Sequence, residues 1–158
     1  MNSYPPRTPI PPGPERDEEV SYTLRKAYSK LLEAEAADPE TTPGSIIHQS
    51  YYALFHLVRA VFLHRTGTHK SRHQTLQADL GDMAREEQLE VFLSFHTKVL
   101  AAAAARTEDD YNNRYYPTLQ EADETRKSTR EVFDRVIAHC GLKVPDMTGE
   151  SPPLPPPP

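Results

Sequence analysis

The sequence has little of what several common kinds of functional site require. Its 158 residues include one cysteine, Cys140, which excludes an intramolecular disulfide and a zinc site built from cysteines. It has no Gly-rich phosphate-binding loop and no Gly-x-Ser-x-Gly nucleophile motif. The longest apolar run, Val99–Ala105, is far shorter than the roughly 20 residues of a membrane-spanning helix. Prolines crowd the N-terminal region where a secretory signal needs an apolar core, so we expect a cytoplasmic protein that does not enter a membrane.

The distribution of proline divides the chain into three parts. Of 16 prolines, only Pro39, Pro43 and Pro117 lie outside the two ends. Proline donates no amide hydrogen and fixes φ, so the ends 1–14 and 145–158 are predicted to be disordered tails. The intervening residues 15–144 are predicted to form one domain, consistent with the length of the chain. A proline-rich tail is also a ligand type for aromatic grooves, and this would make the protein an adaptor.

Helical periodicity dominates the predicted domain, and alternating strand patterns are absent. Apolar residues step by three and four along five segments. We predict an all-α, up-and-down antiparallel helical bundle with four long helices and one short helix. The second helix is apolar on more than one face and is therefore expected to be central. Its apolar surface and the small-residue face Ala101–Ala105 together exceed what one bundle of this size buries, so we also predict a homodimer.

The expected helix limits follow from capping residues and breakers. The second helix is predicted over Ser45–Arg65, with an N-cap at Ser45 and a stop at Gly67. Gly81 interrupts the pattern of the short third helix and weakens that prediction. The fourth helix is predicted over Arg85–Asp110, and the last begins after Pro117.

The charge of the chain is unevenly distributed. The formal net charge is −5, yet residues 41–78 contain no Asp or Glu and hold five of the seven histidines. Such a positive region on an acidic protein attracts phosphate groups or an acidic protein face, so His56 and Arg59 are candidate nucleotide- or RNA-binding residues. The alternative is that this region faces acidic turns of the same chain or of a second subunit. Metal-ligand spacings are poorly represented, and we predict neither a metal nor a cofactor.

A second candidate site follows the alanine run. The segment from Arg106 to Tyr116 combines an arginine, acidic residues and three tyrosines. An arginine here can clamp a phosphate, and a phenol can donate to it or be modified. The structural alternative is that Arg106 and Asp110 form an i, i+4 ion pair while the tyrosines fill the end of the bundle.

The second helix resembles the signature helix of the HEPN domain family. In that family a small residue, two tyrosines and an alanine precede Phe-His, and here the matching residues are Ser50, Tyr51, Tyr52, Ala53, Phe55 and His56. The histidine-led short helix His73–Leu80 is a second match. The pair Arg106 and Tyr111 resembles an Arg–Asp–Tyr element of one branch of the family. The resemblance covers about Asp17–Gly141.

The resemblance implies a metal-independent chemistry carried by an arginine and a histidine at a homodimer interface. In that chemistry a base takes the proton of the ribose 2′-hydroxyl, and the arginine stabilises the developing charge on phosphorus. Arg106 matches the arginine, but Tyr111 stands where the family has histidine. Asp110 or His56 would then have to supply the base. Tyr111 is therefore a candidate catalytic residue or a candidate site of modification.

Three classes of function remain open on the sequence alone. The resemblance implies a toxin- or defence-type module that binds RNA or nucleotide as a homodimer and works with a small nucleotidyltransferase partner. The second class is an active metal-independent ribonuclease that uses Arg106, with Asp110 and Tyr111 as the other candidate catalytic residues. The third class is a non-catalytic helical adaptor whose proline-rich tails recruit other proteins.

Overall fold

The computed structural model describes residues 8–69, 72–87, 90–111 and 117–147. Within α3 and α4, the side chains of residues 74, 87, 93–95, 100 and 105–111 are outside the description. The helices are, in order, α1 (Pro14–Ala36), α2 (Pro43–Thr66), α3 (His73–Glu87), α4 (Glu90–Tyr111) and α5 (Leu119–Cys140).

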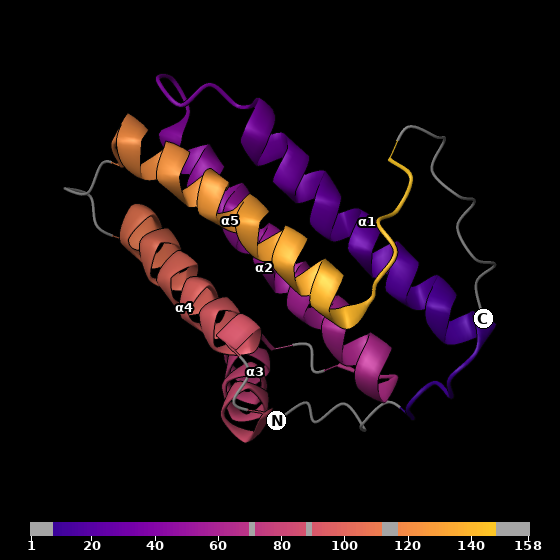
Figure 1. Ribbon diagram of the computed structural model, residues 1–158. Helices are drawn as coiled ribbons and strands as arrows, with labels where there is room; N and C mark the ends of the chain where they lie inside the picture. Colours follow the sequence, from indigo (N-terminus) through magenta and orange to yellow (C-terminus); the bar gives the residue numbers. More distant parts are fainter. Residues whose placement is uncertain (1–7, 70–71, 88–89, 112–116, 148–158) are drawn as a thin grey trace.

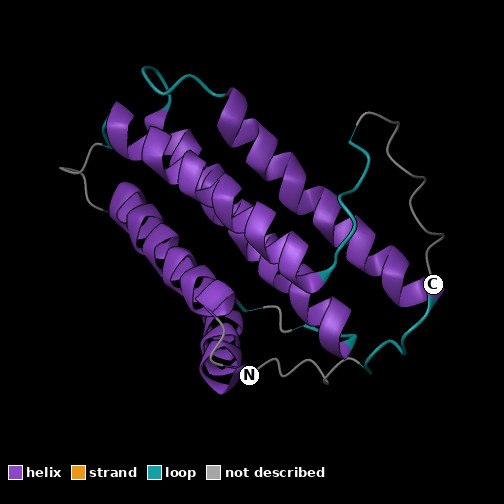
Figure 2. Ribbon diagram, viewed as in Figure 1, coloured by secondary structure: helices purple, strands orange, loops and turns teal. Residues whose placement is uncertain are grey.

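Four long helices lie roughly along one another, and the short α3 continues the bundle at one end (Figure 1). The helix α2 packs against α1, α4 and α5, and also meets α3. Figure 2 shows that the described elements are helices joined by loops, and no strand occurs in these parts of the chain. The predicted all-α bundle of four long helices and one short helix is therefore confirmed. No helix in the described segments is both long and apolar enough to cross a membrane.

The core is built around α2, as its apolar pattern predicted. Residues on two of its faces are buried, because α1 covers one side and α4 and α5 cover another. From the neighbouring helices the largest fully buried side chains are Leu24, Leu31, Leu76, Leu80, Phe92 and Phe133. Burying each such side chain contributes about 1.5–3 kcal/mol relative to exposing it. A central helix with two buried faces leaves one remaining face for other roles.

Two predicted helix limits need correction. The helix α2 begins at Pro43 and not at Ser45, because proline suits the first turn and Thr42 takes the N-cap position. The helix α4 begins at Glu90, and Arg85 belongs to the last turn of α3. By contrast, α5 begins where predicted, since the Thr118 hydroxyl accepts a hydrogen bond from the Glu121 amide at 3.1 Å.

Gly81 lies inside α3 and does not interrupt it, although glycine has a low helix propensity. The reason is the neighbouring helix. A Cβ atom at this position would lie 2.8 Å from the imidazole of His96 on α4. The glycine is therefore a contact surface that lets α3 and α4 approach each other closely.

The segment before α1 is tied to the end of α2. Gly67 ends α2 in a left-handed conformation with φ of +79°, and its carbonyl accepts a hydrogen bond from the Ile10 amide at 3.0 Å. The Arg16 guanidinium donates to the Ile10 carbonyl at 2.7 Å. At the other end of the chain, Met147 packs partly buried against the core. The limits predicted for the domain and its tails remain predictions.

Two arginines of α5 hold the C-terminal end of α1, and we call them the arginine clamp (Arg126 and Arg130). Arg126 Nη1 donates to the carbonyls of residues 35 and 37 at 3.2 and 3.0 Å, groups that helix ends leave without partners. Its Nε donates to Asp123 at 2.9 Å. Arg130 binds both carboxylate oxygens of Glu35, at 2.6 and 2.9 Å. Each charge of the clamp is matched within the same chain.

Candidate nucleic-acid interface

One face of α2 is polar and aromatic. Tyr52, His56 and Arg59 recur at steps of four and three along it, and each is half-buried. The opposite face of α2 carries Leu54 and Val58, which are buried in the core. The two candidate binding residues His56 and Arg59 therefore lie side by side on one helical surface.

The first residue of α3 is attached to this surface by an aromatic stack. The imidazole of His73 lies parallel to the ring of Phe55, with 3.6 Å between the ring centroids. Its Nδ1 also forms a short hydrogen bond with the hydroxyl of Tyr51. The guanidinium carbon of Arg59 lies 4.2 Å from the centroid of the same Phe55 ring. Stacking on an aromatic ring is favourable for a cation, so this arrangement orients Arg59.

His56 lies among cations. Its partial burial is the main cause that lowers the pKa of its imidazole from 6.5 to about 4, and Arg59, Lys26, Lys30 and His73 lower it further. The imidazole is therefore neutral at pH 7. Its Nδ1 atom is buried and has no hydrogen-bond partner among the described residues. Neutral imidazole has one nitrogen that accepts and one that donates.

We call the four residues Lys26, Lys30, His56 and Arg59 the basic seam, because they lie where α1 meets α2. The groups that act on His56 include no carboxylate. On the seam, Lys30 pairs with Glu33 at 3.5 Å in an exposed contact. Exposed pairs of this kind contribute only about 0.2–1 kcal/mol. Binding of phosphate by the basic seam stays a prediction.

The predicted residues Arg106, Asp110 and Tyr111 lie in the last turns of α4, which ends at Tyr111. Their side chains lie outside the described part of the structure. The helix does continue through all three residues, so Arg106 and Asp110 are separated by about one turn. The relation of these residues to His56 and Arg59 stays a prediction.

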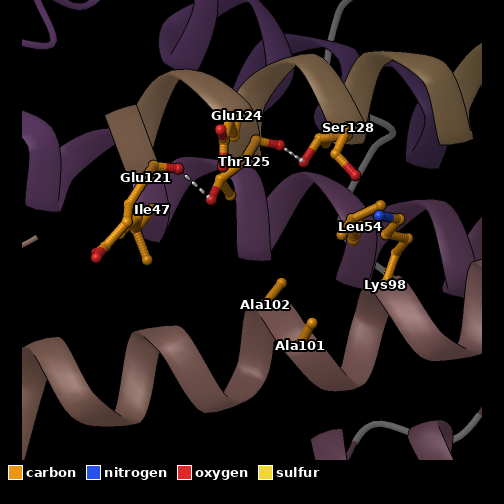
Figure 3. A pocket seen from close by; sticks show the side chains of 10 residues that line it. Ile47, Leu54, Lys98, Ala101, Ala102, Glu121, Glu124, Thr125 and Ser128 are labelled. Atoms are coloured by element: carbon orange, nitrogen blue, oxygen red, sulfur yellow. Dashed lines mark hydrogen bonds between the residues drawn. The ribbon is translucent and has the colours of Figure 1, made fainter. Parts of the chain in front are cut away.

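A cleft of about 300 Å³ opens between α4 and α5 on another side of the bundle. Figure 3 shows Ala101 and Ala102 of α4 pointing into it, where their small side chains leave space. Two of the three hydroxyl groups that line it are bonded to their own helix: Thr125 donates to the Glu121 carbonyl and Thr129 to the Thr125 carbonyl, both at 2.7 Å.

Metal ligation has no support in the described residues, where no three His, Cys, Asp or Glu side chains gather around a common point. His69 and His73 are four residues apart, the spacing of a helical ligand pair, but only His73 lies on a helix, because α3 begins there. Sequence reasoning missed Lys26 and Lys30 as members of a basic surface. The available signal was their i, i+4 spacing on α1, which places them on one side of that helix.

The fold is a small helical bundle, and its central helix α2 carries aromatic and basic side chains. Comparison of the sequence with family profiles identifies the family. The HEPN domain profile matches residues 20–139, which is most of the chain. The chain belongs to the HEPN domain family, whose members are generally associated with ribonuclease or toxin-type functions. A comparison with curated proteins finds no significant match.

Proposed function

We propose that this protein is a toxin- or defence-type HEPN module that binds RNA or nucleotide as a homodimer and works with a small nucleotidyltransferase partner. The observation that carries the proposal is the basic seam. Lys26 and Lys30 of α1 and Arg59 of α2 all act on the imidazole of His56. A group of cations drawn from two helices attracts a phosphate-bearing ligand.

Arg106 is proposed as the residue that contacts the reacting or bound phosphate. It lies in the last turns of α4, which ends at Tyr111. A guanidinium binds phosphate through two parallel hydrogen bonds, and lysine cannot reproduce this geometry. Both Arg106→Ala and Arg106→Lys are therefore expected to lose function while the bundle stays folded.

Cleavage of RNA is the second candidate function, and it uses the same arginine. The continuity of α4 through Tyr111 favours it, because the helix carries a carboxylate, Asp110, about one turn from Arg106. In this mechanism Asp110 takes the proton of the ribose 2′-hydroxyl and Arg106 stabilises the charge on the phosphorane. Tyr111 is a poor base, since a phenol with a pKa of about 10 is protonated at pH 7. It is proposed instead as the residue that the partner modifies.

Growth inhibition tests the proposal. Wild type, Arg106→Ala and Tyr111→Phe chains are expressed without a partner. We expect wild type and Tyr111→Phe to inhibit growth and Arg106→Ala to be harmless. If a small nucleotidyltransferase is encoded beside this protein, its coexpression should relieve inhibition by wild type and leave inhibition by Tyr111→Phe intact. Equal behaviour of wild type and Arg106→Ala would refute the role of Arg106.

Sedimentation measures the proposed assembly separately. At micromolar concentration the full chain is expected to sediment as a dimer. A monomer over this range would exclude the homodimer without deciding whether the basic seam binds RNA.

A further inference from the structure

We propose that the basic seam, extended by Tyr22, is a track for single-stranded RNA that runs between α1 and α2. The inference rests on the proposed function and identifies the surface and the form of nucleic acid that it takes. It adds three residues of α1, namely Tyr22, Lys26 and Lys30, to the binding residues of α2.

The first step is the arrangement of α1. Tyr22, Lys26 and Lys30 recur at intervals of four residues, so they lie in a row along one side of the helix. Tyr22 is 39 % exposed, which makes it one of the few large apolar side chains on the described surface. The Lys26 ammonium lies 4.9 Å from the centroid of the Tyr22 ring. The row thus combines an accessible ring with two cations.

The second step is the contact of this row with α2. Lys26 and Lys30 both lower the pKa of His56, as Arg59 does, so charges from both helices act at one place. The Arg59 guanidinium is in turn held over the Phe55 ring at 4.2 Å. The row on α1 and Arg59 on α2 thus act on the same imidazole, that of His56.

The third step concerns the form of the ligand. Proteins that bind single strands combine cations along the backbone with aromatic rings on which the bases stack. Bases in a duplex are already stacked on one another and cannot lie on Tyr22. A free nucleotide carries its phosphates on one side of a single base, whereas the seam spreads its cations over two helices. The combination of ring and cations consequently favours an unpaired strand.

The lysines are tested by fluorescence anisotropy with a short, 5′-labelled single-stranded oligouridylate and the full chain. The variant is Lys26→Ala with Lys30→Ala, and the matched control is Lys98→Ala with Lys127→Ala, which changes the net charge equally. We expect the seam variant to bind about tenfold more weakly at low salt, and its log–log salt slope to be shallower by about 1.4, or 0.7 per lost charge. The control should bind like wild type.

Tyr22 is tested in the same assay. Tyr22→Ala is expected to weaken binding about fivefold or more, whereas Tyr22→Phe keeps the ring and should bind nearly as wild type does. The duplex of the same sequence and ATP serve as competitors. Both should displace the labelled strand far less effectively than the unlabelled single strand.

The outcomes separate this inference from the proposed function. Wild type that binds the strand while the lysine variant binds equally well would overturn the track and leave RNA binding intact. Wild type that binds no single-stranded RNA would overturn the track and the RNA-binding part of the proposed function together. Displacement by the duplex or by ATP as readily as by the single strand would overturn the assigned form of ligand. Circular dichroism on each variant confirms that the bundle is folded.

Discussion

The positive side chains on the two sides of α1 have different surroundings. Toward α5, the arginine clamp is neutralised by Glu35 and Asp123 and by the carbonyls at the end of α1. Toward α2, burial and the charges of Arg59, Lys26 and Lys30 lower the pKa of His56. A cation whose partners belong to its own chain holds the fold, whereas a surface that gathers cations around a neutral imidazole is suited to a ligand. Mutations on the two sides should therefore affect different properties.

The largest effect is expected from Arg126→Ala. The substitution removes charged hydrogen bonds from a side chain that is 19 % exposed and leaves the carbonyls at the end of α1 without these donors. We expect a loss of about 2–4 kcal/mol in the free energy of unfolding. Urea denaturation measures it, and RNA affinity at a temperature where the variant is folded should equal that of wild type. A weakened affinity would contradict the division between the two sides.

A smaller effect is expected from His56→Gln, and it depends on pH. The pKa of His56 is about 4 in the folded chain and 6.5 in its ordinary state. Below pH 6.5 the unfolded chain takes up a proton that the folded chain does not, so this group costs stability as the pH falls toward 4. Well above pH 6.5 the imidazole is neutral in both states and contributes nothing to the pH dependence.

The cost at pH 4 should be on the order of 1–2 kcal/mol, after allowance for the partial exposure of the side chain. Urea midpoints of wild type and His56→Gln, measured from pH 7 to pH 4, should therefore diverge in the acid range, with the variant losing less. Parallel curves for the two chains would show that the cations of the seam do not act on His56 as described.

The smallest effect is expected from Lys127→Ala on α5. This lysine is 74 % exposed and pairs with Asp123 at 2.9 Å. Asp123 keeps Arg126 as a second partner at 2.7 Å, so the loss should be only about 0.3–0.5 kcal/mol. Thermal denaturation at low and high salt measures it. A loss as large as that of Arg126→Ala would mean that Lys127, rather than Arg126, holds the end of α1.

Periodicity was sufficient to predict the fold. The apolar steps located all five helices, and the apolar faces of α2 indicated its central place, because burial is what those patterns encode. The exact ends of the helices were harder to predict. For example, α2 begins at Pro43 and not at Ser45. Arg126 lies in the apolar row of α5, and only its contacts with the end of α1 explain a charge there.

The candidate site was predictable only in part. The absence of acidic residues from 41–78 pointed to His56 and Arg59, but a pattern read along one segment does not reveal what another helix contributes. Lys26 and Lys30 come from α1, and their relation to His56 depends on how the two helices pack. Arg106, Asp110 and Tyr111 were selected from the sequence, and their part in the site remains a prediction.

Gly81 lies where α3 meets α4, and its lack of a side chain leaves room there for His96. Any sliding or rotation of α3 would replace the glycine by Leu80 or Asp82 opposite His96, where even one added carbon would come within 2.8 Å of the ring. A larger residue at this position would have to displace the imidazole of His96. Two turns earlier on the same helix, His73 stacks on the buried ring of Phe55, so one helix carries both the close contact with α4 and the aromatic contact with α2.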